Sequence, residues 1–258
     1  MQKTSEVYKQ LLAGTHTKEV SLAVGSTGSL VTAQGDKITF GGLGILVAMS
    51  DADGGYGMDR LASLKTSRRV FSGSTPSVGD CVAGEIFATI LKPSAAIPRQ
   101  ARIVPYVRLS DGTRHSEWIQ KGVYFIDTRE TDDSGRNKWL TIHGFDAMLK
   151  AEQDYPPSKL QWPAKDIDVV REIAAAMDVD IDPRTVDLMT SGYLIEYPAD
   201  YSQREVLGYI GAMYAGSWVM NDVGELRLIT MYDLPKESRV LINWQGDAIT
   251  FGGVRIRV

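Results

Sequence analysis

Two aspartates in the segment 50-SDADGGYGMDR-60 have a spacing that could begin a calcium-binding loop. An EF-hand loop needs oxygen ligands at positions 1, 3 and 5, a glycine at position 6 and a glutamate at position 12. When Asp51 is position 1 and Asp53 is position 3, position 6 is Tyr56 and position 12 is Ala62. The spacing excludes an EF-hand, and the segment is predicted to be a polar loop.

The histidines and the single cysteine are the next groups with catalytic potential. His16, His115 and His143 form no H-x-x-x-H pair, so their spacing favours no metal site. Cys81 can form neither an internal disulfide nor a Cys-rich metal site. It begins a strand-like run, where a buried small hydrophobic residue is expected.

Paired carboxylates could support glycoside hydrolysis. We expect Glu85 and Glu117 on neighbouring strands, but with 32 acidic residues in the chain some pair always has this relation. The sequence contains no G-x-S-x-G elbow and no glycine-rich loop followed by the lysine of a P-loop. We therefore predict no catalytic residue, no metal site and no cofactor, and a scaffold or binding module that is not an enzyme.

Composition narrows the classes of partner. The chain has 258 residues, a formal net charge of −4 and 43% hydrophobic residues. The charge gives no electrostatic footprint for specific nucleic-acid binding. No apolar run approaches the roughly 18–20 residues of a membrane span, and the N-terminus has no signal-peptide core. Folding in a cytoplasm without membrane insertion is expected.

The first half of the chain is predicted to be mainly β. Residues 4–12 have helical spacing, and after them the hydrophobic period changes to two. Four strand-like runs then follow at residues 82–92, 101–109, 116–130 and 139–143. Turn signals such as Ser110-Asp111-Gly112 favour hairpin links between them. We predict an antiparallel meander within a barrel or sandwich.

One glycine interrupts the third of these runs. Gly122 is predicted to mark a β-bulge that shifts the register of the strand. Beyond it, apolar side chains would alternate between two faces, with Val123 and Phe125 on one and Tyr124 and Ile126 on the other. A strand with two apolar faces is expected to be covered on both sides, by the barrel core and by a neighbouring domain or subunit.

A cluster of prolines, Pro156, Pro157 and Pro163, predicts a domain boundary. We assign residues 1–155 to a first β-barrel domain and residues 156–258 to a helix-containing second domain. In the second, Ser202 and Glu205 form a capping box that opens a helix, and a hairpin follows. The strand-like pieces at residues 239–243, 248–251 and 254–258 would complete a second barrel.

Two parts of the chain together resemble a known family, the tail hub and baseplate hub proteins of bacteriophages. The first part is 78-VGDCVAGEIFATI-90 with residues 97–128, and the second is 202-SQREVLGYIGAMYAGSWVMNDVGELRLI-229. The first is similar to the leading β-barrel of these hubs and of the N-terminal region of tail-associated proteins. The second is similar to their helix-then-hairpin element. The resemblance implies an α+β, mainly β fold of antiparallel barrels with inserted helices.

The resemblance also implies partners. In this family each subunit carries two similar barrels, so a homotrimer forms a ring of pseudo-sixfold symmetry. Such a ring joins the tail tube or distal tail protein, with its tape-measure protein, to a spike, fibre or lytic tail protein. The expected location is the tail tip or baseplate of a virion assembled in the bacterial cytoplasm. Because the chain ends at Val258, just after a strand, we expect a hub without a hydrolase.

The candidate interface residues are apolar and lie on the strands of the first domain: Trp118, Tyr124, Phe125, Ile126 and Trp139. The loops at residues 50–60 and 131–138 are further possible partner contacts. Two other functions remain open from the sequence. A carbohydrate- or peptidoglycan-binding module would use Trp118, Tyr124 and Trp139 as a stacking platform, and a cell-wall hydrolase would use acidic residues.

Overall fold

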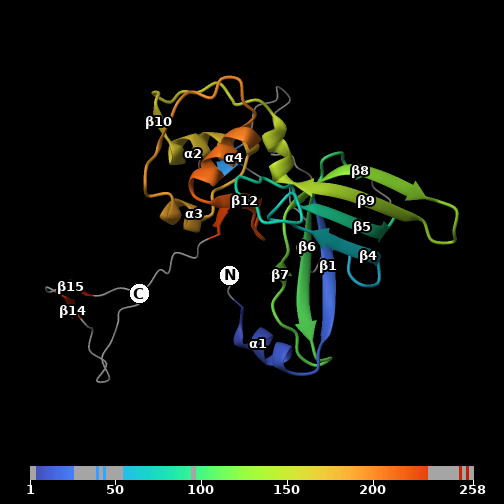
Figure 1. Ribbon diagram of the computed structural model, residues 1–258. Helices are drawn as coiled ribbons and strands as arrows, with labels where there is room; N and C mark the ends of the chain where they lie inside the picture. The colour runs from blue at the N-terminus through green and yellow to red at the C-terminus, as the bar shows by residue number, and fades with distance from the viewer. Residues whose placement is uncertain are drawn as a thin grey trace.

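The computed structural model describes residues 4–25, 39–40, 43–44, 55–93, 97–231, 250–251 and 254–255 (Figure 1). The strands are β1 (Thr17–Gly25), β2 (Thr39–Phe40), β3 (Leu43–Gly44), β4 (Leu61–Ser67), β5 (Glu85–Leu91), β6 (Arg102–Ser110), β7 (Ile119–Gln120), β8 (Tyr124–Asp132), β9 (Trp139–Asp146), β10 (Ala164–Lys165), β11 (Leu194–Ile195), β12 (Gly216–Met220), β13 (Leu226–Thr230), β14 (Thr250–Phe251) and β15 (Val254–Arg255). The helices are α1 (Glu6–Ala13), η1 (Ala147–Glu152), α2 (Asp166–Met177), α3 (Pro183–Leu188) and α4 (Gln203–Met213). The predicted mainly β, α+β class is confirmed.

The main sheet is antiparallel and has the strand order β1-β6-β8-β9-β5-β4, with β7 also paired to β6. The meander prediction is wrong, because β5 pairs with β9 and not with its sequence neighbour β6. The link between β5 and β6 includes Pro93 and Pro98 and is longer than the two to five residues of a tight hairpin. The link therefore crosses from β5 to β6 past β9 and β8, which lie between them in the sheet. This arrangement is related to a Greek key.

The two ends of this sheet approach each other near the start of β4. Leu22 of β1 and Tyr56 exchange two backbone hydrogen bonds, of 3.0 and 2.8 Å, and the chain enters β4 shortly after Tyr56. In the described part of the chain this is an isolated bridge, so the strands form a curled open sheet and not the closed barrel that was predicted.

Alternate side chains of the sheet form a buried core on one of its faces. The largest include Ile86, Ile90, Ile103 and Ile142, each fully buried in one cluster with Leu22. This burial follows the period of two along each strand, because successive side chains point to opposite faces.

The register shift predicted at Gly122 is confirmed. On β6, Val107 pairs with Ile119, but Ile103 pairs with Tyr124, so the strand containing Gly122 holds one extra residue between the pairs. Gly122 has φ of +129°, which favours glycine.

The side chains beyond the bulge alternate as predicted. Tyr124 and Ile126 lie in the sheet core, and Val123 and Phe125 lie on the opposite face. That second face is covered by this same chain, since Phe125 also packs against the core of the helical segment and Lys150 Nζ lies 4.7 Å from the centre of its ring.

The helices α2, α3 and α4 gather beside the β12–β13 hairpin, away from β4, β5, β8 and β9 (Figure 1). The core of this helical unit surrounds Trp218, which is fully buried and donates from Nε1 to the carbonyl of Leu207 at 2.6 Å. The predicted capping box is confirmed: Ser202 Oγ accepts from Glu205 N, and Glu205 accepts from Ser202 N.

The helical unit is joined to the sheet by residues 79–81, which precede β5. Gly79 N donates to Gly216 O at 2.7 Å, and Trp218 N donates to Asp80 O at 2.7 Å, so this segment forms an isolated parallel bridge with β12. Gly79 also packs against α4, because a Cβ on Gly208 would lie only 2.8 Å from Gly79 O.

This close approach yields a first prediction. Gly208→Ala places a methyl group against backbone and is expected to lower the free energy of unfolding by about 1–3 kcal/mol, although alanine favours helix by about 1 kcal/mol. Urea unfolding would measure the loss. The control is Gly73→Ala, whose Cβ would meet no atom closer than 3.9 Å. Equal stability of the two variants would contradict tight packing between Gly79 and α4.

The core of the helical unit draws on both sides of the predicted boundary at residues 155/156. It includes Cys81, Met148, Ala151 and Tyr155, which all precede that boundary. The boundary itself stays a prediction. The predicted strand at residues 239–243 lies outside the described residues, as do parts of the strands predicted at 248–251 and 254–258 and of the loop at 50–60.

Candidate functional site: an arginine-lined pocket

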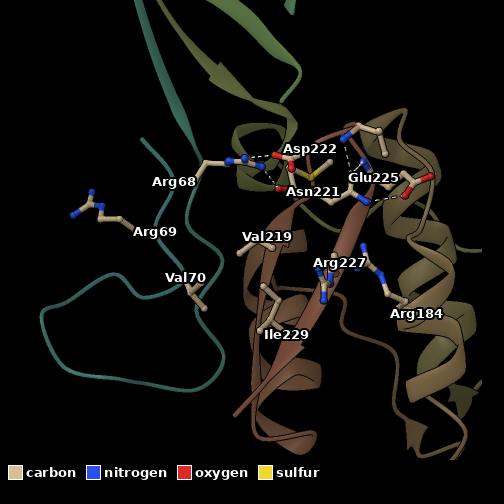
Figure 2. A pocket seen from close by; sticks show the side chains of 12 residues that line it. Arg68, Arg69, Val70, Arg184, Val219, Asn221, Asp222, Glu225, Arg227 and Ile229 are labelled. Atoms are coloured by element: carbon tan, nitrogen blue, oxygen red, sulfur yellow. Dashed lines mark hydrogen bonds and ion pairs between the residues drawn. The ribbon is translucent and has the colours of Figure 1, made fainter. Parts of the chain in front are cut away.

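A pocket of about 350 Å³ lies between the chain that leaves β4 and the outer face of the β12–β13 hairpin. Figure 2 shows the loop after β4 on one side and the hairpin with α3 on the other. The lining residues are Arg68, Arg69, Val70, Arg184, Val219, Met220, Asn221, Asp222, Val223, Glu225, Arg227 and Ile229. The pocket thus combines guanidinium groups with branched aliphatic side chains.

Arg68 ties the end of β4 to the turn of the hairpin. Its guanidinium forms an ion pair with Asp222 and also lies 3.5 Å from the carbonyl of Met220 (Figure 2). The positive charge of Arg68 is therefore already matched by a carboxylate of the pocket.

Asp182 organises the other side of the pocket. It is 1% exposed and accepts from Arg184 Nε at 2.8 Å and from Asn221 Nδ2 at 3.0 Å. It also caps α3 by accepting from Arg184 N at 3.0 Å. Burial alone would raise the pKa of Asp182, but the hydrogen bonds from Arg184 and Asn221 outweigh burial and hold this pKa well below its usual range. The carboxylate is therefore ionised and fixes Arg184 in place.

Arg227 is less completely satisfied. Its Nε is buried without a hydrogen-bond acceptor, and the closest acidic oxygen, Asp182 Oδ2, is 3.9 Å away. Arg69 is exposed, and no ion pair or hydrogen bond joins it to another described residue. Glu225 accepts from Asn221 Nδ2 at 2.7 Å.

The arrangement is suited to binding an anionic group. Four arginines and two carboxylates line the pocket, and Asp182 is a third carboxylate in contact with these arginines, which leaves one positive charge in excess. Guanidinium groups bind carboxylates and phosphates through charge-assisted hydrogen bonds. Among the described residues no cluster of histidine, cysteine and acidic side chains could hold a metal ion.

The sequence-predicted interface residues lie elsewhere, on the main sheet. Tyr124 and Ile126 are 0% and 2% exposed and belong to the sheet core. Phe125 is half-buried against the helical unit. Trp118 is half-buried, with the guanidinium carbon of Arg108 4.3 Å from the centre of its ring, and Trp139 is half-buried at the start of β9. An interface role for these residues stays a prediction.

The residues considered for catalysis are dispersed. Glu85 begins β5, whereas Glu117 precedes β7 and accepts from Ser5 N at 2.7 Å beside α1. The expectation of neighbouring strands is wrong, because β9, β8 and β6 separate β5 from β7 in the sheet.

The histidines and the cysteine also lie apart from any common site. His143 stacks on Phe87 with ring centroids 4.2 Å apart, and His115 Nδ1 lies 3.4 Å from Glu19. His16 Nδ1 contacts the carbonyl of Gly14 at 3.0 Å. Burial raises the pKa of the Cys81 thiol to about 12, so this cysteine is a core residue as predicted.

Sequence reasoning did not predict this pocket, and it missed Arg184 and Arg227 altogether. Arg184 and Arg227 are far apart in the chain and match no motif. The available signal was the alternation on β13, where buried Leu226 and Leu228 predict that Arg227 points away from the core. Asp182, the N-cap residue of α3, is brought to Arg227 only by the tertiary fold.

Among the described residues, no helix has the length and apolar character needed to cross a membrane. No protein-family model matches the chain, and no curated protein matches it.

The solved structures to which the chain is similar include two tail proteins and a chain of a PdpA-VgrG complex. The tail protein from Neisseria meningitidis MC58 is 13% identical with a TM-score of 0.39, and the match covers 61% of this chain and 46% of that one. The 43 kDa tail protein of prophage MuSo2 from Shewanella oneidensis is 10% identical with a TM-score of 0.47, covering 92% and 62%. A chain of the Francisella PdpA-VgrG complex is 7% identical with a TM-score of 0.46, covering 89% and 35%. The chain therefore spans less than two thirds of the length of each of these structures.

Proposed function

We propose that this chain is a structural hub of a phage or phage-like tail tip or baseplate. It acts as a homotrimeric ring that joins the sixfold tail tube or distal tail ring to a threefold spike, fibre or lytic module. The proposal assigns it no catalytic step. Its work is mechanical: to hold two differently shaped assemblies together.

The observation that carries the proposal is the packing of the segments that resemble tail hubs. Residues 79–81 pair with β12, and a Cβ on Gly224 in the hairpin turn would lie 2.8 Å from Val123 Cγ2. Segments far apart in the sequence are therefore joined by backbone hydrogen bonds in one place and by a side chain packed against a turn in the other. A connector that transmits force needs such contacts, because close-packed interiors transmit strain.

A ring also needs surfaces that meet a second copy. In the described part of the chain, β4 pairs only with β5, which leaves its other edge without a named partner strand. An unpaired strand edge is a ready template for pairing with another chain. Trp118 and Trp139 remain candidate interface residues, since both are half-buried in one chain.

A carbohydrate-binding module is the alternative, and the positions of its expected residues count against it. Tyr124 is fully buried, and Trp118 is covered on one face by Arg108. A stacking platform needs exposed aromatic faces that a sugar ring can reach.

The trimer is tested by light scattering and sedimentation of the full chain, alone and mixed with the ring protein of its tail. We expect a mass about three times the 28.3 kDa of one chain. Trp139→Ala should weaken assembly more than Thr141→Ala, an exposed position on the same strand. A monomer in both samples that binds peptidoglycan fragments would contradict the hub and favour the binding module.

A further inference from the structure

The outer face of the β12–β13 hairpin has an amphipathic character that the hub role does not explain. Trp218, Met220, Leu226 and Leu228 point into the core of the helical unit. The alternate positions on the opposite face place Val219 directly across from Arg227, with Ile229 next along the strand. An aliphatic strip therefore runs beside a guanidinium group on the floor of the pocket (Figure 2).

The charge of the pocket differs in sign from that of the whole chain. The chain has a formal net charge of −4, whereas the four arginines of the pocket exceed the three nearby carboxylates, Asp182, Asp222 and Glu225, by one. Arg68 pairs with Asp222, and Arg184 pairs with Asp182. Arg227 shares Asp182 with Arg184 at the longer distance of 3.9 Å, so Arg227 and Arg69 keep the most capacity for a further anion. Arg227 is the more confined of the two, with a buried Nε that has no hydrogen-bond acceptor.

The two properties together select the class of occupant. A free inorganic anion would use the guanidinium but leave Val70, Val219 and Ile229 exposed to water. An extended peptide that alternates an acidic and an aliphatic side chain would satisfy both, because covering apolar area stabilises a complex by about 25 cal/mol per Å². A carboxylate beside Arg227 would add a charge-assisted hydrogen bond.

We propose that this pocket binds an acidic, aliphatic segment of a partner protein, and that Arg227 holds the carboxylate of that segment. The assignment of the partner to the tail rests on the proposed function, whereas the peptide chemistry rests on the pocket alone. The segment lies across the hairpin between the loop after β4 and α3.

The test uses a fluorescein-labelled octapeptide of alternating glutamate and valine, with the full-length chain titrated against it in fluorescence anisotropy. We expect saturable binding that weakens as salt rises, because salt screens the ion pair. Glutamine–valine and lysine–valine octapeptides should bind at least about tenfold more weakly, the expected value of one charge-assisted hydrogen bond.

Matched variants locate the site. Arg227→Gln should weaken binding of the acidic peptide about tenfold, and Val219→Asn should weaken it without changing the salt dependence. Arg171→Gln removes the same charge from α2, outside the pocket, and should leave binding unchanged. Urea unfolding of each variant separates loss of binding from loss of fold.

The outcomes also separate this inference from the hub. A trimer that fails to bind the acidic peptide overturns the pocket inference alone. The peptide assignment is overturned if inorganic phosphate competes with the peptide and Val219→Asn still binds the peptide normally. The pocket would then recognise the anion alone. If the chain is a monomer that binds the peptide, and Arg227→Gln abolishes this binding, the pocket inference is supported and the hub proposal is overturned.

Discussion

Trp218→Ala is expected to lower the free energy of unfolding by about 3–5 kcal/mol, the range for removing a buried aromatic side chain. Trp218 is fully buried at the centre of the helical unit. Its backbone N–H also donates a hydrogen bond to Asp80 O, in the segment that leads into β5. Loss of this side chain therefore leaves a cavity where the hairpin, α4 and residues 79–81 meet.

A smaller change separates packing from hydrogen bonding at this position. Trp218→Phe keeps most of the ring but leaves the carbonyl of Leu207, now 2.6 Å from Nε1, without this donor. Because Leu207 lies within α4, its carbonyl keeps the helical hydrogen bond. Loss of the bond from Nε1 should therefore cost about 0.5–1.5 kcal/mol, which places this variant between Trp218→Ala and the unsubstituted chain.

The measurement for both variants is urea unfolding followed by far-UV circular dichroism, at one fixed protein concentration. The control is Trp139→Ala, because Trp139 is half-buried at the start of β9. We expect it to cost less than half as much as Trp218→Ala. Equal losses for the two tryptophans would show that the helical unit does not depend on Trp218 for its packing.

Local patterns in the sequence predicted several parts of this fold correctly. The Ser202–Glu205 capping box and the bulge at Gly122 are each determined by residues within a few positions of one another. Steric and hydrogen-bonding rules of this range can be applied to sequence alone.

Strand order could not be predicted in the same way. The hairpin prediction for the link at residues 92–101 is wrong, because the partner of β5 is decided by the shared core that contains Ile86, Ile103 and Ile142. The cover over Phe125 was predicted, yet the sequence left open whether a domain of this chain or another subunit supplies it. The pocket was missed for the same reason, because Asp182 and Arg227 meet only after the hairpin and α3 have packed.

Asp146 is expected to make the stability of the chain depend on pH between about pH 4 and pH 7. It lies at the end of β9, 4% exposed, where it accepts from Gly84 N at 2.8 Å and caps η1 by accepting from Met148 N at 3.0 Å. Burial raises the pKa of this carboxyl to about 7, because it outweighs the two backbone hydrogen bonds and the charges of Arg68 and Arg204.

The direction follows from linkage. Because the folded pKa is above the ordinary value, the folded state binds a proton more tightly than the unfolded chain. The stabilisation from Asp146 is fully present below about pH 4 and is lost as the pH rises through about 7. About three pKa units at 1.36 kcal/mol each set an upper limit of ~4 kcal/mol on this loss.

Asp146→Asn removes the titrating carboxyl, so comparison with this variant separates the contribution of Asp146 from that of the other carboxylates. The difference in free energy of unfolding between the original chain and this variant should fall by as much as ~4 kcal/mol from pH 4 to pH 7.5. The matched control is Asp182→Asn, because hydrogen bonds from Arg184 and Asn221 overcome burial and lower the pKa of Asp182. The difference in free energy of unfolding between the original chain and Asp182→Asn should stay constant over that range and fall only below about pH 4. A difference for Asp146→Asn that is flat, or that grows with pH, would show that the backbone donors of Gly84 and Met148 keep this carboxylate ionised at the junction of sheet and helices.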